Sequence, residues 1–440
     1  MASRQTRGER ERAAGPPRTR AGDALGGGLL LLMSAATGLA VAGNYFAQPL
    51  LDVIGRDLHL GPTGAGLVVT AAQIGYALGL ILLVPLGDLV ERRGLAVGLL
   101  GATAAFLLVS AAAPNGPVLL AGTLLTALAS VAAQVVVPFA VALADPARRG
   151  RVVGTVMTGL LLGSLLARTF AGGLSELGGW RTVFWVHAVL VATVAVLLWR
   201  RLPRLHTPAG LSYPRLLGST LSLFRDEPVL RWRAAIGALS MASFTLFWTA
   251  VTFLLAGPGY GWTEAAIGLF GLVGVAGTLA TPVAGRLADR GLTQWVTGGG
   301  ALLLALAWPM IGAGGQSLPW LLGGVLVLNA AQQAVLNSNQ NVVYGLGEQI
   351  RNRVNSAFMT AFFAGGAAGS ALAPVVWVTA GWAGASALGG ALAAATFATW
   401  AAERRWAARR GQGALHAKPR PRRRPAGRVR AEHARGRLKP

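Results

Sequence analysis

The sequence predicts an all-α membrane protein of twelve transmembrane helices, arranged as two pseudo-symmetric halves of six. Three observations lead to this fold: the composition, the length of the charge-free runs and a set of repeated loop motifs. Of the 440 residues, 53% are apolar and 12% are charged, whereas soluble domains carry about 25% charged residues. The composition therefore excludes most soluble classes.

Eight charge-free runs, and a ninth interrupted only by Arg168, define the predicted helices. A membrane-spanning helix needs about 20 apolar residues to cross roughly 30 Å of hydrocarbon. Three of the runs are long enough for two helices each, and each has a turn near its middle, at Pro114–Gly116, Gly314–Pro319 and Ala380–Trp382. The runs are 24–51, 60–87, 94–144, 152–175, 182–199, 234–263, 265–285, 291–347 and 354–402.

The distribution of Lys and Arg predicts the orientation, because cytoplasmic loops of membrane proteins are enriched in these residues. With both termini in the cytoplasm, 36 of the 39 lie inside and two, Arg56 and Arg181, outside. We predict a multi-pass protein of the bacterial inner membrane, in which the first helix is an uncleaved anchor.

The same pattern divides the chain into five parts. The net charge is +23, and the two ends of the chain carry 15 of these charges. The predicted parts are a basic cytoplasmic tail (1–24), an N-terminal half (25–200), a cytoplasmic linker (201–231), a C-terminal half (232–402) and a disordered basic tail (403–440).

Matching residues in the two halves indicate that a six-helix unit is duplicated. Most of the matches share one offset, and the loop after the second helix of each half matches at a nearly equal offset. The pairs are Arg149/Arg351, Arg151/Arg353, Gly163/Gly365 and Gly179/Gly381 at an offset of 202, and Gly87/Gly285 and Arg92/Arg290 at 198.

The loop at 87–94, Gly-Asp-Leu-Val-Glu-Arg-Arg-Gly, and its second copy from Gly285 resemble the signature of the major facilitator superfamily. Segments around Asn44-Tyr45 and Arg351-x-Arg353 are similar to those of twelve-helix exporters of the drug/proton antiporter type. The resemblance covers about residues 25–402. It implies a secondary transporter whose halves rock about a midplane site, with proton-coupled efflux of a small organic compound as the favoured activity.

Two other functions stay open at this point: uptake or uniport of a metabolite without protons, and a receptor or scaffold that transports nothing. An enzyme is not expected, because no catalytic constellation occurs and the chain has no Cys. The sequence contains no phosphate-binding loop of the Gly-x-x-x-x-Gly-Lys type, so ATP is not expected to be the energy source. We expect no cofactor and no metal.

The repeated loop is expected to act as a gating latch. A carboxylate of the motif can lie near a helix N-terminus and an arginine of the neighbouring helix, and such a cluster would hold the cytoplasmic side shut. The alternative is that these charges only enforce topology. The residues are Gly87, Asp88, Glu91, Arg92, Arg93, Gly285, Asp289 and Arg290.

Arg168 is the only charged residue in the core of a predicted helix, and no Asp or Glu lies at membrane depth. A buried arginine is costly in hydrocarbon, so it should face the central cavity or pair with polar groups. We expect it to bind an anionic substrate group or to tune a proton site. The alternative is that its head group snorkels or pairs structurally.

Two further residues are proton-coupling candidates alongside Arg168. His187 is the one histidine within a predicted helix and titrates in a useful range, although a structural role is the more common one. Asp52 lies just outside the first helix, where it could exchange protons or simply be solvated.

Polar side chains on four predicted helices are candidates for binding substrate, because amides that face lipid are expensive. Some of them could instead join helix to helix. Together with Arg168 and Trp248, the candidates are Asn44, Gln48, Gln73, Tyr76, Gln134, Asn329, Gln333 and Asn337.

The partners follow from the same features. They are a small-molecule substrate, protons and membrane lipids, with anionic lipid at the basic C-terminal tail. Nucleic acid is not expected, since no aromatic or folded reader accompanies the charge. A chain of six plus six helices can be complete as a monomer.

Overall fold

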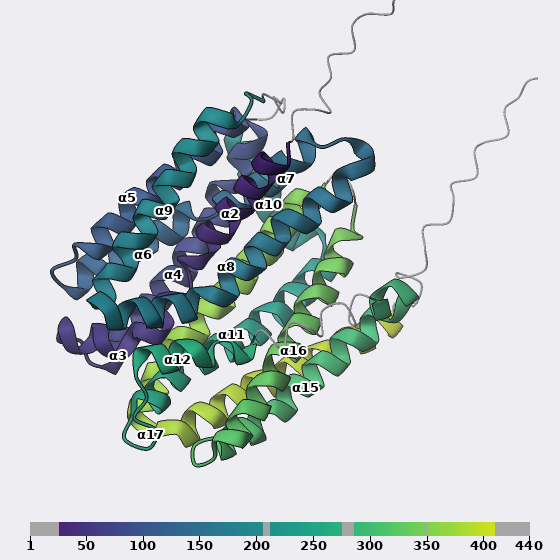
Figure 1. The fold of residues 1–440 in the computed structure, drawn as a ribbon. Coiled ribbons are helices and arrows are strands. Elements are labelled where there is room, and N and C mark those ends of the chain that lie inside the picture. The colour runs from purple at the N-terminus through teal and green to yellow at the C-terminus, as the bar shows by residue number, and fades with distance from the viewer. Residues whose placement is uncertain (1–25, 206–211, 275–285, 348–349, 410–440) are drawn as a thin grey trace, which may run out of the picture.

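The computed structural model describes residues 26–205, 212–274, 286–347 and 350–409. This part of the chain is a bundle of long helices and contains no strand. The N-terminal half, coloured purple to teal in Figure 1, lies beside the green to yellow C-terminal half. The predicted all-α membrane fold is confirmed.

Eight α-helices form the N-terminal half. They are α2 (Gly27–Ala42), α3 (Ala47–Asp57), α4 (Pro62–Leu82), α5 (Arg92–Ala111), α6 (Gly116–Ala129), α7 (Ala132–Leu143), α8 (Arg149–Gly178) and α9 (Trp180–Arg201). The short 3-10 helices η2 (Val84–Asp88) and η3 (Pro146–Arg148) follow α4 and α7. The breaks between α2 and α3 and between α6 and α7 each divide one predicted span into two helices. The half therefore has more α-helices than predicted membrane spans.

The linker and the C-terminal half contain the remaining elements of the described residues. Helix α10 (Tyr213–Asp226) lies within the predicted linker. The second half comprises α11 (Pro228–Ala256), α12 (Glu264–Phe270), the π-helical turn η4 (Ala288–Leu292), α15 (Thr293–Ala313), α16 (Leu318–Tyr344) and α17 (Arg351–Arg409).

Nine helices of the described residues are long and apolar enough to cross a membrane, and the bent pair α2/α3 makes a tenth candidate. Helix α17 reverses at Gly381, which has φ 59° and joins two helices. The predicted run 265–285 is described only in part, because residues 275–285 lie outside the described residues. The fold class is therefore confirmed, and the count of twelve stays a prediction.

At each predicted turn within the three double runs, one helix ends and the next begins. Asn115 caps α6 by accepting a hydrogen bond of 3.1 Å from the backbone N–H of Val118. Helices α15 and α16 end and begin at Ala313 and Leu318. Gly381 adopts the left-handed conformation that favours glycine.

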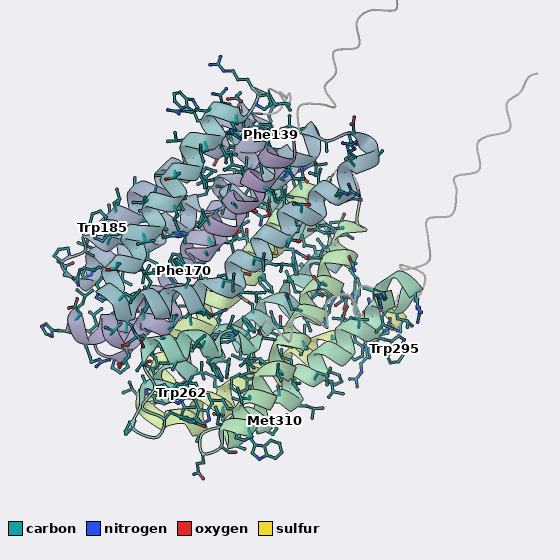
Figure 2. All side chains as sticks on the ribbon, in the orientation of Figure 1. Phe139, Phe170, Trp185, Trp262, Trp295 and Met310 are labelled. Carbon is teal, nitrogen blue, oxygen red and sulfur yellow. The ribbon has the colours of Figure 1, made fainter. Side chains whose placement is uncertain are left out.

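Large apolar side chains cover the outside of the bundle (Figure 2). Phe170 is 54% exposed and Trp295 is 69% exposed. Such a surface matches a lipid environment rather than water.

Glycines allow the closest helix contacts in each half. A Cβ atom at Gly163 of α8 would lie 2.2 Å from the carbonyl oxygen of Gly38 on α2. Its repeat partner Gly365 on α17 stands against Ala238 of α11, where a Cβ would lie 2.1 Å from the carbonyl oxygen. Small residues are what let membrane helices approach this closely, and the two glycines make equivalent contacts in the two halves, as a pseudo-symmetric fold predicts.

Two details differ from the sequence prediction. Residues 43–46 form a turn that bends the first span by 43° between α2 and α3, so Asn44 and Gln48 do not share one regular helix face as expected. Helix α17 also continues to Arg409. The C-terminal half thus extends beyond the predicted end at residue 402. The physical reason is that Glu403 forms a buried ion pair with Arg233 inside the bundle.

Candidate functional site

The two halves are packed together at one end of the bundle. We call this the distal end, formed by α3 and α12, and the end that carries α10 the linker end (Figure 1). At the distal end, a Cβ on Gly66 would lie 2.6 Å from the ring of Pro374, and one on Gly172 would lie 2.2 Å from the carbonyl oxygen of Glu264.

Polar contacts also join the halves at the distal end. Arg56 pairs with Glu264 of the other half at 3.4 Å and with Asp52 at 2.6 Å. The Thr169 hydroxyl donates to the carbonyl oxygen of Gly268 at 2.9 Å. The distal end is therefore closed in this structure.

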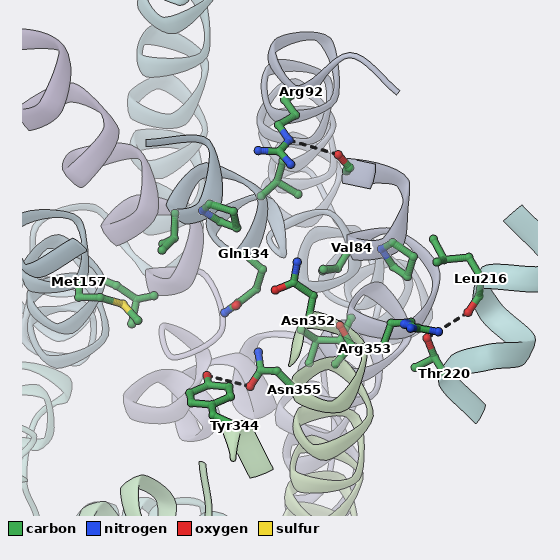
Figure 3. Close-up of a pocket in the computed structure, with 18 residues that line it drawn as sticks. Val84, Arg92, Gln134, Met157, Leu216, Thr220, Tyr344, Asn352, Arg353 and Asn355 are labelled. Carbon is green, nitrogen blue, oxygen red and sulfur yellow. Dashed lines mark hydrogen bonds between the residues drawn. The ribbon is translucent and has the colours of Figure 1, made fainter. Parts of the chain in front are cut away.

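At the linker end, a cavity of about 210 Å³ lies between the halves (Figure 3). We call it the vestibule. Arg92 and Gln134 reach it from the N-terminal half, Arg353 and Asn355 from the C-terminal half, and Thr220 from α10. In this conformation, the distal end is closed and a cavity lies at the linker end.

A second cavity, of about 110 Å³, lies deeper between the halves, and we call it the central cavity. Helix α8 lines both cavities: Met157 and Leu160 face the vestibule, and Ser164 and Arg168 the central cavity. The cavities therefore follow one another along the same helix. The central cavity is also lined by Tyr45, Leu165, Met241, Phe244, Asn329, Gln332, Gln333, Leu336 and Phe362.

Arg168 is the charged group of the central cavity and is only 6% exposed. Its Nε donates to the side-chain oxygen of Gln48 at 2.6 Å. The guanidinium lies 4.2 Å from the ring centroid of Trp248 and 4.8 Å from that of Tyr45, an arrangement that favours a cation. The structure places two of the predicted residues, Gln48 and Trp248, in contact with Arg168.

The other predicted polar residues of the N-terminal half do not line the central cavity. Asn44 accepts a hydrogen bond of 3.5 Å from the Ser130 hydroxyl within the half. Gln134 donates to the Tyr76 hydroxyl at 3.3 Å, and Gln134 also lines the vestibule. Gln73 is buried, and its side-chain oxygen has no hydrogen-bond partner among the described residues.

Only part of the predicted polar row on α16, Asn329, Gln333 and Asn337, lines the central cavity. Asn329 and Gln333 line it, whereas Asn337 does not. The sequence analysis did not select Gln332, which lines this cavity with a buried side-chain oxygen that lacks a partner among the described residues. A search for every buried amide, not only an i, i+4 row, would have included it.

The remaining proton-coupling candidates lie away from the central cavity. His187 is buried within the N-terminal half, where its ring meets that of Phe46 edge-on at 4.3 Å. Its Nε2 has no hydrogen-bond partner among the described atoms. Asp52 is partly exposed at the distal end and pairs with Arg56.

The first copy of the predicted latch lies at the start of α5. Glu91 caps that helix by accepting from the backbone N–H of Arg93 at 2.9 Å and of Gly94 at 2.8 Å. Burial acts to raise the pKa of Glu91, but these bonds and one from Leu205 of the linker outweigh it, so the pKa is lowered. Arg92 donates from Nε to the carbonyl oxygen of Gly87 at 3.4 Å.

The expected arginine of a neighbouring helix is replaced by the linker at this site. The backbone N–H of Arg92 donates to Leu205 at 3.2 Å, and Leu205 donates to Glu91 at 3.4 Å. In the second copy, Arg290 is exposed within η4. Gly285 and the side chains of Asp88 and Asp289 lie outside the described residues.

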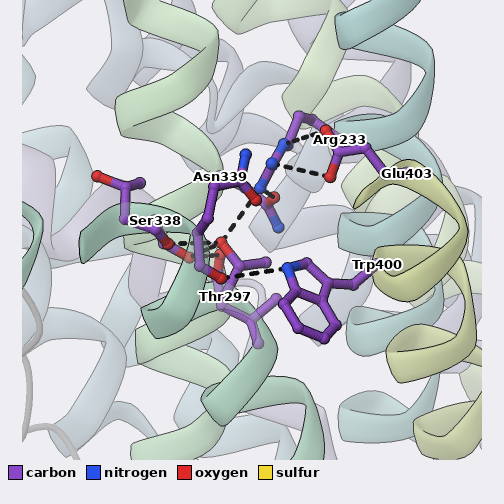
Figure 4. Close-up of polar contacts among 9 residues, drawn as sticks. Arg233, Thr297, Ser338, Asn339, Trp400 and Glu403 are labelled. Atoms are coloured by element: carbon purple, nitrogen blue, oxygen red, sulfur yellow. Dashed lines mark hydrogen bonds and ion pairs between the residues drawn. The ribbon is translucent and has the colours of Figure 1, made fainter. Parts of the chain in front are cut away.

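A buried ion pair inside the C-terminal half escaped the sequence analysis (Figure 4). Arg233 is fully buried, and its Nε donates to Glu403 at 2.9 Å, while Nη2 and the other carboxylate oxygen form an ion pair at 2.8 Å. Its Nη1 also donates to Thr297 at 3.1 Å and to Asn339 at 3.2 Å. The pair was missed because both residues stand at the ends of apolar runs, where charges usually face water.

Within the described residues, no group of three His, Asp or Glu side chains could hold a metal ion. The chemistry that the site offers is that of binding: a fixed cation, aromatic faces and amides in a cavity between two halves.

Comparison with known proteins identifies the family. The sequence profile of the Major Facilitator Superfamily matches residues 33–370. The chain therefore belongs to this superfamily and is a membrane transporter, not an enzyme.

Relatives in bacteria support this assignment. The chain is 48% identical to the "Uncharacterized transporter YgaY" of Escherichia coli, over 84% of this chain and 94% of that protein. It is 36% identical to the "Probable transporter SCO4007" of Streptomyces coelicolor, over 82% and 84%. It is 26% identical to the "Chloramphenicol efflux pump Rv0191" of Mycobacterium tuberculosis, over 79% and 85%.

Solved transporter structures share the fold. A bacterial homologue of the human lysosomal transporter Spinster, solved in an inward-facing and occupied conformation, has a TM-score of 0.69 at 16% identity, over 87% of this chain and 96% of that one. The human organic anion transporter MFSD10 has a TM-score of 0.65 at 19% identity, over 86% and 100%.

Proposed function

We propose that this transporter exports a small organic compound from the cytoplasm in exchange for protons, by alternating access. The observation that carries the proposal is the position of Arg168. It is a buried cation in a cavity between the two halves, near a vestibule at one end and behind a closed interface at the other. A midplane site that faces one side at a time is what alternating access requires.

Export, rather than another direction, is supported by a relative. The Mycobacterium tuberculosis protein that is 26% identical over 79% of this chain carries the name of a chloramphenicol efflux pump. In our proposal the linker end faces the cytoplasm of a bacterial cell, and both termini lie on the same side. This orientation is the one predicted from the 36 Lys and Arg residues assigned to the cytoplasmic side. The vestibule is then where the compound enters from the cytoplasm.

The proposed site keeps the predicted residues and gives them separate roles. Arg168, Gln48, Trp248, Asn329 and Gln333 form the substrate site. Further residues position it or line the route, namely Asn44, Gln73, Tyr76, Gln134 and Asn337. Arg168, His187 and Asp52 stay the candidates for coupling to protons.

The loop at 87–93 is proposed to act as the latch when the linker end closes. Glu91 is held by backbone N–H groups of α5 and by Leu205, which ties the linker to this loop. We also propose that the protein acts as a monomer and that its basic C-terminal tail binds anionic lipid.

One observation favours a second candidate, transport without protons. None of the described residues that line the vestibule or the central cavity is Asp or Glu, and intramembrane carboxylates are frequent proton carriers. Uniport or uptake of a metabolite would then replace antiport.

The test uses everted membrane vesicles that contain the protein and are acidified inside. Cationic, neutral and anionic compounds are added while the internal pH is followed. We expect proton release with the wild type that is absent from empty vesicles and lost in Arg168→Ala. Arg200→Gln, at an exposed position near the end of α9, serves as the matched control.

Each other outcome contradicts part of the proposal. Release that persists in Arg168→Ala would keep antiport and remove Arg168 from it. Saturable flux of a compound that ignores the pH gradient would establish the second candidate in place of proton exchange.

A further inference from the structure

The central cavity contains a buried positive charge that no acidic side chain among the described residues neutralises. The ion pairs among the described residues involve Arg56, Arg181 and Arg233, and none involves Arg168. Gln48, which bonds its Nε, is a neutral amide. The rings of Tyr45 and Trp248 stabilise the cation without cancelling its charge.

The terminal nitrogens of Arg168 are the free part of the group. Only Nε has a hydrogen-bond partner among the described residues, although the side chain is more than nine-tenths buried and lines the central cavity. A guanidinium binds carboxylates with two parallel hydrogen bonds from such nitrogens. A buried charge with unused donors is costly unless a ligand satisfies it.

The rest of the cavity wall is apolar or neutral. Phe244, Phe362 and Met241 face it beside Leu165 and Leu336. The amides of Asn329, Gln332 and Gln333 form the polar part, and the Gln332 side-chain oxygen has no partner among the described residues. A ligand that fits this wall has an apolar or aromatic body and few polar groups besides the one at Arg168.

The vestibule carries the same sign of charge. Its charged lining residues are Arg92 and Arg353 (Figure 3), and none of its described lining residues is acidic. Amide and hydroxyl groups of Gln134, Asn355 and Tyr344 accompany them. A cleft lined by one sign of charge raises the local concentration of the opposite ion. The route to Arg168 therefore attracts anions and repels cations.

We infer that the substrate is an amphipathic organic anion, whose carboxylate binds the terminal nitrogens of Arg168 and whose apolar body packs against Phe244, Phe362 and Met241. This inference rests on the proposed function and narrows it to one charge class. A cationic compound would have to enter beside an unneutralised guanidinium in a cavity without a described carboxylate.

The test compares compounds that differ only in charge. Three sets are used at pH 7.5, with phenylalkyl, indolylalkyl and naphthylalkyl bodies, and each set holds a carboxylate, its amide and its amine. Binding to the purified full chain in lipid nanodiscs is measured as a rise in melting temperature with concentration. We expect at least one carboxylate to bind at least 10-fold more tightly than its amide, and the amines not to bind.

Variants assign the preference to Arg168. Arg168→Gln should weaken carboxylate binding at least 10-fold and leave the amides unchanged, and Arg168→Lys should keep the preference for the carboxylate. Arg200→Gln is the control, and the melting temperature without ligand shows that each variant is folded.

Several results would overturn the inference: amides that bind as tightly as carboxylates, a preference for amines, no binding by any carboxylate, or wild-type binding by folded Arg168→Gln. Failure of the proposed function is a separate result. Carboxylate flux that ignores a pH gradient in proteoliposomes would remove proton exchange and keep the anion, whereas proton-linked export of a cation would do the reverse.

Discussion

Two buried arginines, Arg168 and Arg233, have opposite surroundings. Arg233 lies inside the C-terminal half, fully buried, with Glu403, Thr297 and Asn339 bonded to its guanidinium. Arg168 lies between the halves, and its one hydrogen-bond partner among the described residues is Gln48. The carboxylate of Glu403 neutralises the first of these charges, whereas none of the described carboxylates pairs with the second, which lines a cavity.

In our proposal, this difference distinguishes a structural charge from a charge that binds substrate. A guanidinium that only joins helices needs a full set of partners from the protein, because an unpaired buried charge is costly. A guanidinium that binds a ligand must keep donors free while it stays oriented. Tyr45 and Trp248 orient Arg168 in this way without using its terminal nitrogens.

The largest expected effect breaks the structural member of the comparison. Arg233→Ala leaves Glu403 buried without its counter-ion, and breaking a buried pair in this way costs about 3–5 kcal/mol. The free energy of unfolding, measured by SDS titration in mixed micelles, should fall by this amount. The double variant Arg233→Met/Glu403→Met should recover most of it, and a double variant as unstable as Arg233→Ala would contradict the account.

The next effect concerns Arg168 and appears in transport rather than stability. Arg168→Ala removes one hydrogen bond together with a buried charge that has no counter-ion, so the free energy of unfolding should fall much less than in Arg233→Ala. Substrate-driven flux in vesicles should fall at least about 10-fold, which corresponds to 1.4 kcal/mol of binding. A loss of stability as large as that of Arg233→Ala would show that Arg168 is structural.

Access to Arg168 depends on closure of the distal end, and Gly66→Ala sharpens this point. The added Cβ would lie 2.6 Å from the rigid ring of Pro374, so the halves cannot approach as they do here. We expect flux to fall several-fold. Labelling of an introduced cysteine at Phe244 by an impermeant maleimide from the distal side should increase.

The chain suits this labelling experiment because it contains no native Cys. Gly98→Ala is the matched control, since a Cβ there would meet nothing within 4 Å. Equal labelling of both variants would contradict the assignment of Gly66 to closure.

The smallest effect extends the comparison to a charge satisfied by backbone groups. Burial acts to raise the pKa of Glu91, but hydrogen bonds from Gly94, Arg93 and Leu205 lower it below its usual value of 4.5. The ionised form therefore stabilises the fold above about pH 4.5, and this contribution is lost as the pH falls through the lowered pKa.

Glu91→Ala should lower the free energy of unfolding by about 1 kcal/mol at pH 7, as for other helix caps. The difference from the wild type should shrink as the pH falls below about 4.5, measured by the same SDS titration. A difference that grows toward low pH would contradict the capping role.

The sequence predicts the fold class and singles out Arg168, because both depend on patterns along the chain. Charge-free runs and repeats define helices, and Arg168 stands out as a lone charge within such a run. Arg233 and Glu403 do not stand out, because each ends a run beside other charges. Their 170-residue separation brings them together only through tertiary packing.

Side-chain facing was the other part that the sequence could not supply. The spacing of Asn44 and Gln48 suggests one helix face, but the turn at 43–46 sends Asn44 toward Ser130 and Gln48 toward Arg168. The row of Asn329, Gln333 and Asn337 likewise reaches the central cavity only with its first two members.

The most direct test of the difference between the two arginines is the exchange rate of a labelled aromatic carboxylate in proteoliposomes, compared between Arg168→Gln and Arg233→Met/Glu403→Met. Our account predicts that the first variant is folded but loses exchange, whereas the second exchanges at a rate near that of the wild type. Exchange retained by Arg168→Gln, or lost by the folded double variant, would contradict it.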